Sequence, residues 1–131
     1  MEQRKINPWK WQDQYGFSQG IEVSNASRVL YCAGQASVDD KGSPVHVGDM
    51  RKQIEQAFGN LETVLKASGF GLANVVRLNY YTTDVERFLS ASDVVASRLT
   101  EAACQPSGTL LGVAKLGFPG LMIEIEATAV T

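Results

Sequence analysis

The sequence predicts a single α+β domain whose elements follow the order ββαβαββ, with two helices packed on one face of one mixed sheet. Three observations predict this class. The 131 residues, 44% of them apolar, suit one globular domain spanning residues 1–131. Two segments repeat apolar residues at spacings of three and four, as helices with one buried face do. Runs of β-branched and aromatic residues, bounded by turn residues, precede, separate and follow these segments.

The first two strands are expected over residues 20–23 and 29–36. They are separated by Ser24-Asn25-Ala26-Ser27, a cluster whose side chains satisfy the backbone of turns. The segment therefore predicts a hairpin. Residues 38–44 are polar and contain Gly42 and Pro44, which indicates an exposed loop.

The first helix is expected to begin after Asp49, whose carboxylate can cap the first amides, and to stop at Gly69, which tolerates the left-handed conformation. The residues of its buried stripe are Met50, Ile54, Ala57, Phe58, Leu61, Val64, Leu65 and Ser68. Residues 75–82 then predict a strand with Val76, Leu78 and Tyr80 on one face.

The second helix is expected to start at Thr83, because Thr83 and Glu86 have the spacing of a capping box. It continues to Ala102 and ends before Pro106; its apolar stripe comprises Val85, Phe88, Leu89, Val95 and Leu99. Residues 109–116 and 121–130 predict the last two strands. With both helices on one face of the sheet, Tyr31, Tyr81 and Val113 would leave an apolar surface on the other, so we expect self-association.

Composition narrows the classes of partner. Twelve basic and fourteen acidic residues give a net charge of −2, which does not favour binding to nucleic acid or to anionic lipid. The sequence contains no run of about 18 apolar residues, so it predicts no membrane span. Cys32, Cys104 and His46 do not provide the four ligands of a structural zinc site. We expect a cytoplasmic protein without a structural zinc site.

Five segments together resemble the RidA/YjgF family of enamine and imine deaminases, formerly labelled endoribonuclease L-PSP, along nearly the whole chain. They are Gly16-Phe17-Ser18-Gln19-Gly20, Tyr31-Cys32-Ala33-Gly34-Gln35, the helix from Asp49 to Leu61, Tyr81-Thr82-Thr83-Asp84 and Ile123-Glu124-Ile125-Glu126-Ala127. The resemblance implies a chorismate-mutase-like protomer. It also implies a homotrimer with small-molecule clefts between subunits and cofactor-independent hydrolysis of reactive imines.

The resemblance also implies site residues, and this chain departs from most of them. Glu124 matches the glutamate that helps to place the attacking water and is the expected catalytic residue. Gly108 stands where the family has an arginine that grips the substrate carboxylate. The tyrosine, serine and asparagine of the family fall on Phe17, Ala33 and a position near Ser92. The predicted substrate-binding set is Phe17, Ala33, Gly34, Ser92, Gly108 and Thr109.

Loss of the two-point arginine contact is expected to cost about a hundredfold or more in affinity for a carboxylate. We therefore expect a ligand other than a simple 2-imino acid, either larger or uncharged. Arg28, Arg77 and Arg98 are alternative cations for the cleft, and the sequence does not choose among them. Glu124 and Glu126 also fit a solvated strand face, since they alternate with Ile123 and Ile125.

Three functions stay open at this point. The first is hydrolysis of an imine, enamine or related C–N bond, with Glu124 orienting water. The second is a non-catalytic metabolite-binding or regulatory module of the same fold, because most of the family's site residues are replaced. The third, RNA cleavage, follows the older family label and is disfavoured by the acidic charge.

Overall fold

The computed structural model describes all 131 residues and places a four-stranded path, β3-β7-β5-β6, at the centre of the molecule. These strands span Val29–Tyr31, Ile123–Val130, Val75–Thr82 and Leu110–Gly112. The short strand β4 (Gln35–Ala36) also pairs with β7. Strands β5 and β6 are parallel, whereas β3, β4 and β5 all run antiparallel to β7. The sheet is therefore mixed, as predicted.

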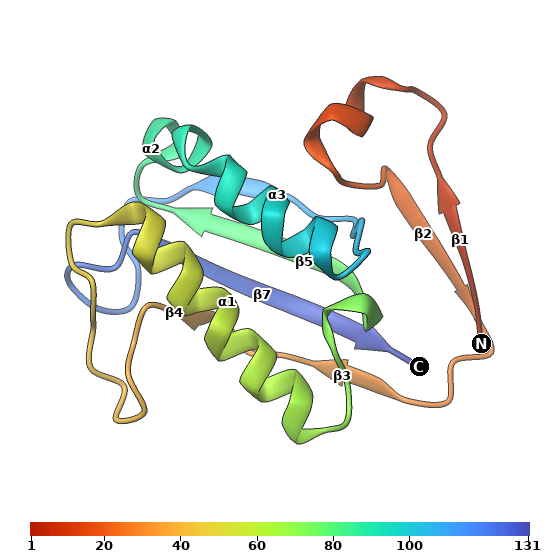
Figure 1. Cartoon of the computed structure of the whole chain (residues 1–131), viewed down its shortest axis with the longest axis horizontal. Helices are drawn as coiled ribbons and strands as arrows, with labels where there is room; N and C mark the ends of the chain where they lie inside the picture. Colours follow the sequence, from red (N-terminus) through yellow and green to blue (C-terminus); the bar gives the residue numbers. More distant parts are fainter.

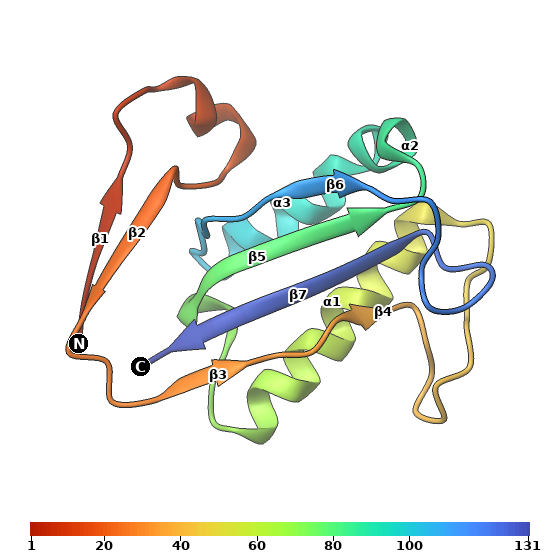
Figure 2. The ribbon, with the colours of Figure 1, turned by 180° about the vertical axis from the view of Figure 1, so that it is seen from behind.

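Three helices cover one face of this sheet, and the other face is bare (Figures 1 and 2). They are α1 (Met50–Ala67), α2 (Val85–Ser90) and α3 (Ser92–Glu101). The core lies between the helices and the sheet; its fully buried members include Phe58 and Leu61 from α1, Leu78 from β5, and Ile123 and Ile125 from β7. The α+β class with helices on one face is confirmed.

Helix α1 agrees closely with its sequence pattern. Asp49 precedes it in an extended conformation, and its carboxylate accepts a hydrogen bond from the Lys52 amide at 3.1 Å. Gly69 follows the helix with φ +76°, the left-handed conformation that favours glycine. All the predicted stripe residues are buried except Val64 and Ser68, which are half-buried; Ser68 is the residue that follows the helix.

The second helix differs from the prediction, because two shorter helices, α2 and α3, replace it and meet at Ala91. The break leaves Leu89 52% exposed, although a continuous stripe would bury it. The predicted capping box is also wrong. The Thr83 amide donates to the Met122 carbonyl at 3.2 Å, and Asp84 caps α2 through the Arg87 amide at 3.0 Å.

The predicted hairpin between residues 20–23 and 29–36 is wrong as well. Strand β2 (Gly20–Ser24) pairs with β1 (Glu2–Ile6), a strand that the sequence patterns did not indicate. Strands β1 and β2, with the 3₁₀ helix η1 (Trp11–Tyr15) between them, form an N-terminal arm of residues 1–24 (Figure 1). A second 3₁₀ helix, η2 (Leu72–Asn74), leads into β5.

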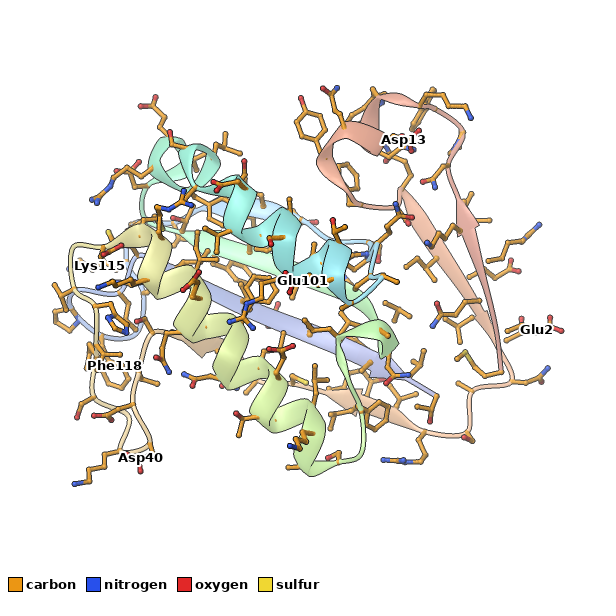
Figure 3. The ribbon with its side chains drawn as sticks, in the orientation of Figure 1. Glu2, Asp13, Asp40, Glu101, Lys115 and Phe118 are labelled. Carbon is orange, nitrogen blue, oxygen red and sulfur yellow. The ribbon has the colours of Figure 1, made fainter.

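The C-terminal strands are shorter than predicted at their facing ends. Strand β6 is limited to Leu110–Gly112, and β7 begins at Ile123. Residues 113–122 form a loop at the end of the sheet where α1 begins, where Figure 3 labels Lys115 and Phe118. Gln53 of α1 ties this loop down, because its fully buried amide donates to the Gly120 carbonyl at 2.8 Å and accepts from the Met122 amide at 2.8 Å.

Candidate functional site

An apolar pocket of about 310 Å³ lies between α3, the β5–β6 edge of the sheet and the N-terminal arm. Four of the predicted substrate-binding residues line it: Phe17, Ser92, Gly108 and Thr109. The remaining lining residues are Tyr15, Leu78, Tyr80, Phe88, Leu89, Val95, Ala96, Leu99, Pro106 and Leu110. No charged side chain lines the pocket, so it suits an apolar ligand better than a carboxylate, whose desolvation would go uncompensated.

The N-terminal arm closes one side of the pocket. Buried Ser18 holds it, because its amide donates to the Pro106 carbonyl at 3.1 Å and its hydroxyl to the Gln105 carbonyl at 2.6 Å. Half-buried Phe17 then reaches the pocket, with its ring edge-on to Trp11 at 5.7 Å. Tyr15 and Phe17 line this side of the pocket, and Trp11 packs against both, so the wall is aromatic.

Gly108 lies where the main chain leading into β6 passes unusually close to β5. A Cβ atom built on Gly108 would lie 1.9 Å from the Leu78 carbonyl oxygen. The backbone bonds on either side, from Leu78 to Ser107 and from Tyr80 to Thr109, are both 2.8 Å long. An arginine therefore has no room at this position unless the strand moves.

Glu124 lies apart from this pocket, on the bare face of the sheet. Its neighbours Ile123 and Ile125 are buried against the helices, as the alternation predicts. Gly34 lies directly against it, because a Cβ on Gly34 would come 2.2 Å from Glu124 Oε1. Glu124 makes no hydrogen bond or ion pair with the protein through its side chain. It is a free carboxylate, available to a water molecule or ligand.

Glu126, two residues along the same strand, is engaged. Its Oε1 accepts a short hydrogen bond from the Tyr81 hydroxyl and a second one from Asn79 Nδ2 at 3.3 Å. The hydrogen bond to Glu126, with a smaller contribution from burial, raises the pKa of Tyr81. Of the two glutamates, only Glu124 is therefore unpaired. Both border a hollow of about 340 Å³ together with Gly34, Tyr81 and Lys115.

The predicted site residues thus fall into two groups within the chain. Phe17, Ser92, Gly108 and Thr109 surround the apolar pocket on the helix side of the β6 edge. Glu124 and Gly34 border the hollow on the bare face, and exposed Ala33 immediately precedes Gly34 in the chain. One chain does not bring the two groups together.

The bare face is less apolar than predicted. Tyr31 is 79% exposed and Leu111 48% exposed, but the hydrogen-bonded cluster of Tyr81, Asn79 and Glu126 lies between them in the sheet. Burial of this face by another subunit would therefore have to accommodate polar groups.

The three candidate arginines occupy different places. Arg28 stacks over the Phe70 ring, 4.5 Å from its centroid, and Arg98 pairs with Glu62 at 2.6 Å. Arg77 donates to the Thr109 hydroxyl at 3.4 Å, so it is the one cation of the three beside a predicted site residue.

Sequence reasoning did not select Tyr15, Tyr81 or Lys115, which border the two hollows. The only available signal was that Tyr81 shares a strand face with Asn79 and Arg77. Cys32 and Cys104 are buried and unpaired, and burial raises the pKa of Cys104 to about 11. No group of three or more His, Cys, Asp or Glu side chains is placed to hold a metal ion. No helix is both long and apolar enough to cross a bilayer.

Fold and pocket together define a small α+β protein with an apolar pocket beside one edge of its sheet. Residues 12–131 match the family model described as Endoribonuclease L-PSP. The chain therefore belongs to this family, the RidA/YjgF family.

Two curated relatives illustrate the range of names within it. A RutC family protein of Pyrococcus horikoshii is 31% identical over 113 residues, which cover 86% of this chain and 85% of that protein. The 2-iminobutanoate/2-iminopropanoate deaminase of Dermatophagoides farinae is 28% identical over 87% of this chain and 84% of its own.

Solved structures agree with the fold. The Rid-family protein YyfB of Yersinia pestis, whose function is described as unknown, matches with a TM-score of 0.87 at 33% identity. That match covers all of both chains, so it includes the N-terminal arm. RidA of an Antarctic Psychrobacter species matches with a TM-score of 0.69 at 28% identity over 88% of each chain.

Proposed function

We propose that the protein is a cytoplasmic homotrimer with a small-molecule site at each subunit interface. There it hydrolyses an imine, enamine or related C–N bond in a ligand that is larger than a simple 2-imino acid or uncharged. One observation carries this proposal: the chain offers an uncharged, aromatic-walled pocket and, on the bare face of its sheet, a carboxylate, Glu124, that no protein group pairs. The two buried free thiols are compatible with a reducing compartment.

Glu124 is suited to orienting water. Its carboxylate accepts a hydrogen bond from the water and takes its proton as the oxygen attacks the carbon of a protonated C=N bond. The new C–O bond gives a carbinolamine as the π electrons of the C=N bond move to nitrogen. Glu124 then returns its proton to that nitrogen. As the C–N bond breaks, the hydroxyl group loses its proton to the same carboxylate, which releases ammonia or an amine and leaves a carbonyl product. Gly34 leaves the space that the carboxylate needs.

The test measures how strongly the protein accelerates the hydrolysis of two imines over their spontaneous rates. One is 2-iminobutanoate, generated in place by a dehydratase; the other is the uncharged imine of benzaldehyde and propylamine. We expect the wild-type protein to accelerate loss of the uncharged imine more strongly. Rapid turnover of 2-iminobutanoate would contradict the inferred ligand class.

The role of Glu124 has its own test. Glu124→Gln should reduce the catalysed rate at least about a hundredfold, within the range known for general bases. Glu55→Gln, on the exposed side of α1, serves as the matched control and should retain it. An unchanged rate in Glu124→Gln would remove this residue from the mechanism.

A non-catalytic binding module is the second candidate, because Glu124 and the pocket lie in different parts of the protomer. In that case the benzaldehyde imine would bind without accelerated loss, and Glu124→Gln would bind it equally well. RNA cleavage has less support, since the pocket offers no cation to a phosphate.

A further inference from the structure

The N-terminal arm is poorly supported by its own chain. Every residue of β1 is exposed, and β1 and β2 form a separate two-stranded sheet that stands away from the main one (Figures 1 and 2). Such a ribbon is marginally stable in water on its own. The polar contacts of the arm with the rest of the chain are made by Ser18 and Lys5, the latter donating to Gln105 Oε1 at 2.7 Å. Further support for the ribbon has to come from another surface.

Strands β2 and β3 each have one unpaired edge, as β1 and β6 also do. Strand β2 pairs with β1 on one side only, and β3 pairs with β7 on one side only. Free edges of this kind accept further strands through backbone hydrogen bonds. The turn residues 24–27 are typical of an antiparallel pairing between these two segments, yet the chain does not make it.

The fold explains why the pairing is missing within one chain. The arm is anchored by Ser18 at Pro106, next to the β6 edge of the sheet, whereas β3 forms the opposite edge. The β3 side is also fixed, because the Ser27 amide donates to the Thr131 carbonyl at 2.8 Å. The chain changes course just before it, at Asn25, which has φ +57°. An arm seated on its own pocket therefore leaves β3 of its own chain uncovered.

We infer that the arm joins neighbouring copies: β2 of one subunit pairs antiparallel with β3 of the next. With the end of β2 aligned with the start of β3, Ser24 lies opposite the partner subunit's Val29, and Glu22 lies opposite the partner subunit's Tyr31. Such an interface joins different surfaces of the two copies, so repetition around a rotation axis closes a ring. The inference rests on the proposed oligomer and extends it to a specific contact.

This pairing also unites the two halves of the candidate site. Phe17 lies just before β2 and lines the pocket, and the partner subunit's Ala33 and Gly34 follow β3. Extending the sheet therefore brings the partner subunit's Glu124 towards the pocket that holds Phe17, Ser92, Gly108 and Thr109. Each site is then completed by a second copy.

Disulfide trapping tests the pairing directly. Glu22→Cys and Tyr31→Cys are produced with different affinity tags and mixed by co-expression. Opposed residues of antiparallel strands have Cα atoms about 4.5 to 5.5 Å apart, which a disulfide can span. We expect oxidation to give a mixed covalent dimer on a non-reducing gel only when both variants are present. Wild type is the control, since Cys32 and Cys104 are buried.

The double variant Glu22→Cys/Tyr31→Cys separates pairing between chains from pairing within one. Between chains, it should form covalent multimers up to the full ring. An internal disulfide in a monomeric band would overturn the inference, as would the absence of any crosslink. Because the readout does not depend on turnover, its failure is distinguishable from failure of the proposed hydrolysis.

Discussion

Gly108→Ala is expected to destabilise the protein, although the substitution adds only one methyl group. That methyl group would lie 1.9 Å from the Leu78 carbonyl oxygen, whereas real Cβ atoms essentially never come within 3.0 Å of such an atom. The obstacle is backbone, so the chain at β6 has to move by about 1 Å, which a close-packed interior resists.

The magnitude follows from the bonds on either side of Gly108. The Leu78–Ser107 and Tyr80–Thr109 backbone hydrogen bonds, both 2.8 Å, would stretch or break. Each contributes about 1 kcal/mol net, and an unmet buried partner costs about 1 to 3 kcal/mol. We expect the free energy of unfolding to fall by about 2 to 5 kcal/mol. Urea denaturation at one fixed protein concentration measures this, because oligomer stability depends on concentration.

Two other glycines provide matched controls for the same substitution. Gly59, in the interior of α1, has open space where an added methyl group would lie, with nothing within 4 Å, so Gly59→Ala should stabilise by about 0.5 to 1 kcal/mol. At Gly34 the obstacle is the mobile end of the Glu124 side chain. Gly34→Ala should therefore change stability little and reduce turnover by displacing that carboxylate. A Gly108→Ala protein within about 0.5 kcal/mol of wild type would refute the close-approach reasoning.

Further predictions concern the loop, the arm and pH. Gln53→Leu should lower the unfolding free energy by about 3 kcal/mol, because it leaves the Gly120 carbonyl and Met122 amide unpaired; exposed Gln14→Leu should cost under about 0.5 kcal/mol in the same denaturation assay. Ser18→Ala removes the hydroxyl bond to Gln105 and should speed tryptic cleavage after Lys10, whereas equal rates would contradict the anchoring role. Burial raises the pKa of Cys104 from 9.0 to about 11, so stability should be lost as pH rises from about 9 through 11, and Cys104→Ala should flatten that part of the profile.

Local signals predicted the helical part of the fold well and the strand pairing less well. Asp49 and Gly69 bracket α1 because capping depends on neighbouring residues alone. The turn at residues 24–27 was recognisable, but a turn does not specify which edge β2 joins. Similarly, Thr83 and Glu86 had the spacing of a cap, yet the Thr83 amide was already bonded to Met122, a contact between distant residues.

The candidate site was predicted residue by residue, while its division into two groups was not. Phe17, Ser92, Gly108 and Thr109 do converge on one pocket. The separation of Glu124 from them depends on which face of the sheet each residue occupies. The close approach of Gly108 to Leu78 is likewise a property of two paired backbones, which no sequence pattern records.

The short strand β6 gives the pocket one wall that lies at an open edge of the sheet. This strand has three residues and lies parallel to β5 at the edge of the sheet, with no neighbour on its other side. Its amides should exchange with solvent deuterium by local fraying, long before those of β7, which is paired on both sides. The pocket wall that contains Leu110 therefore lies in an edge strand, where local fraying costs less free energy than opening a strand that is paired on both sides.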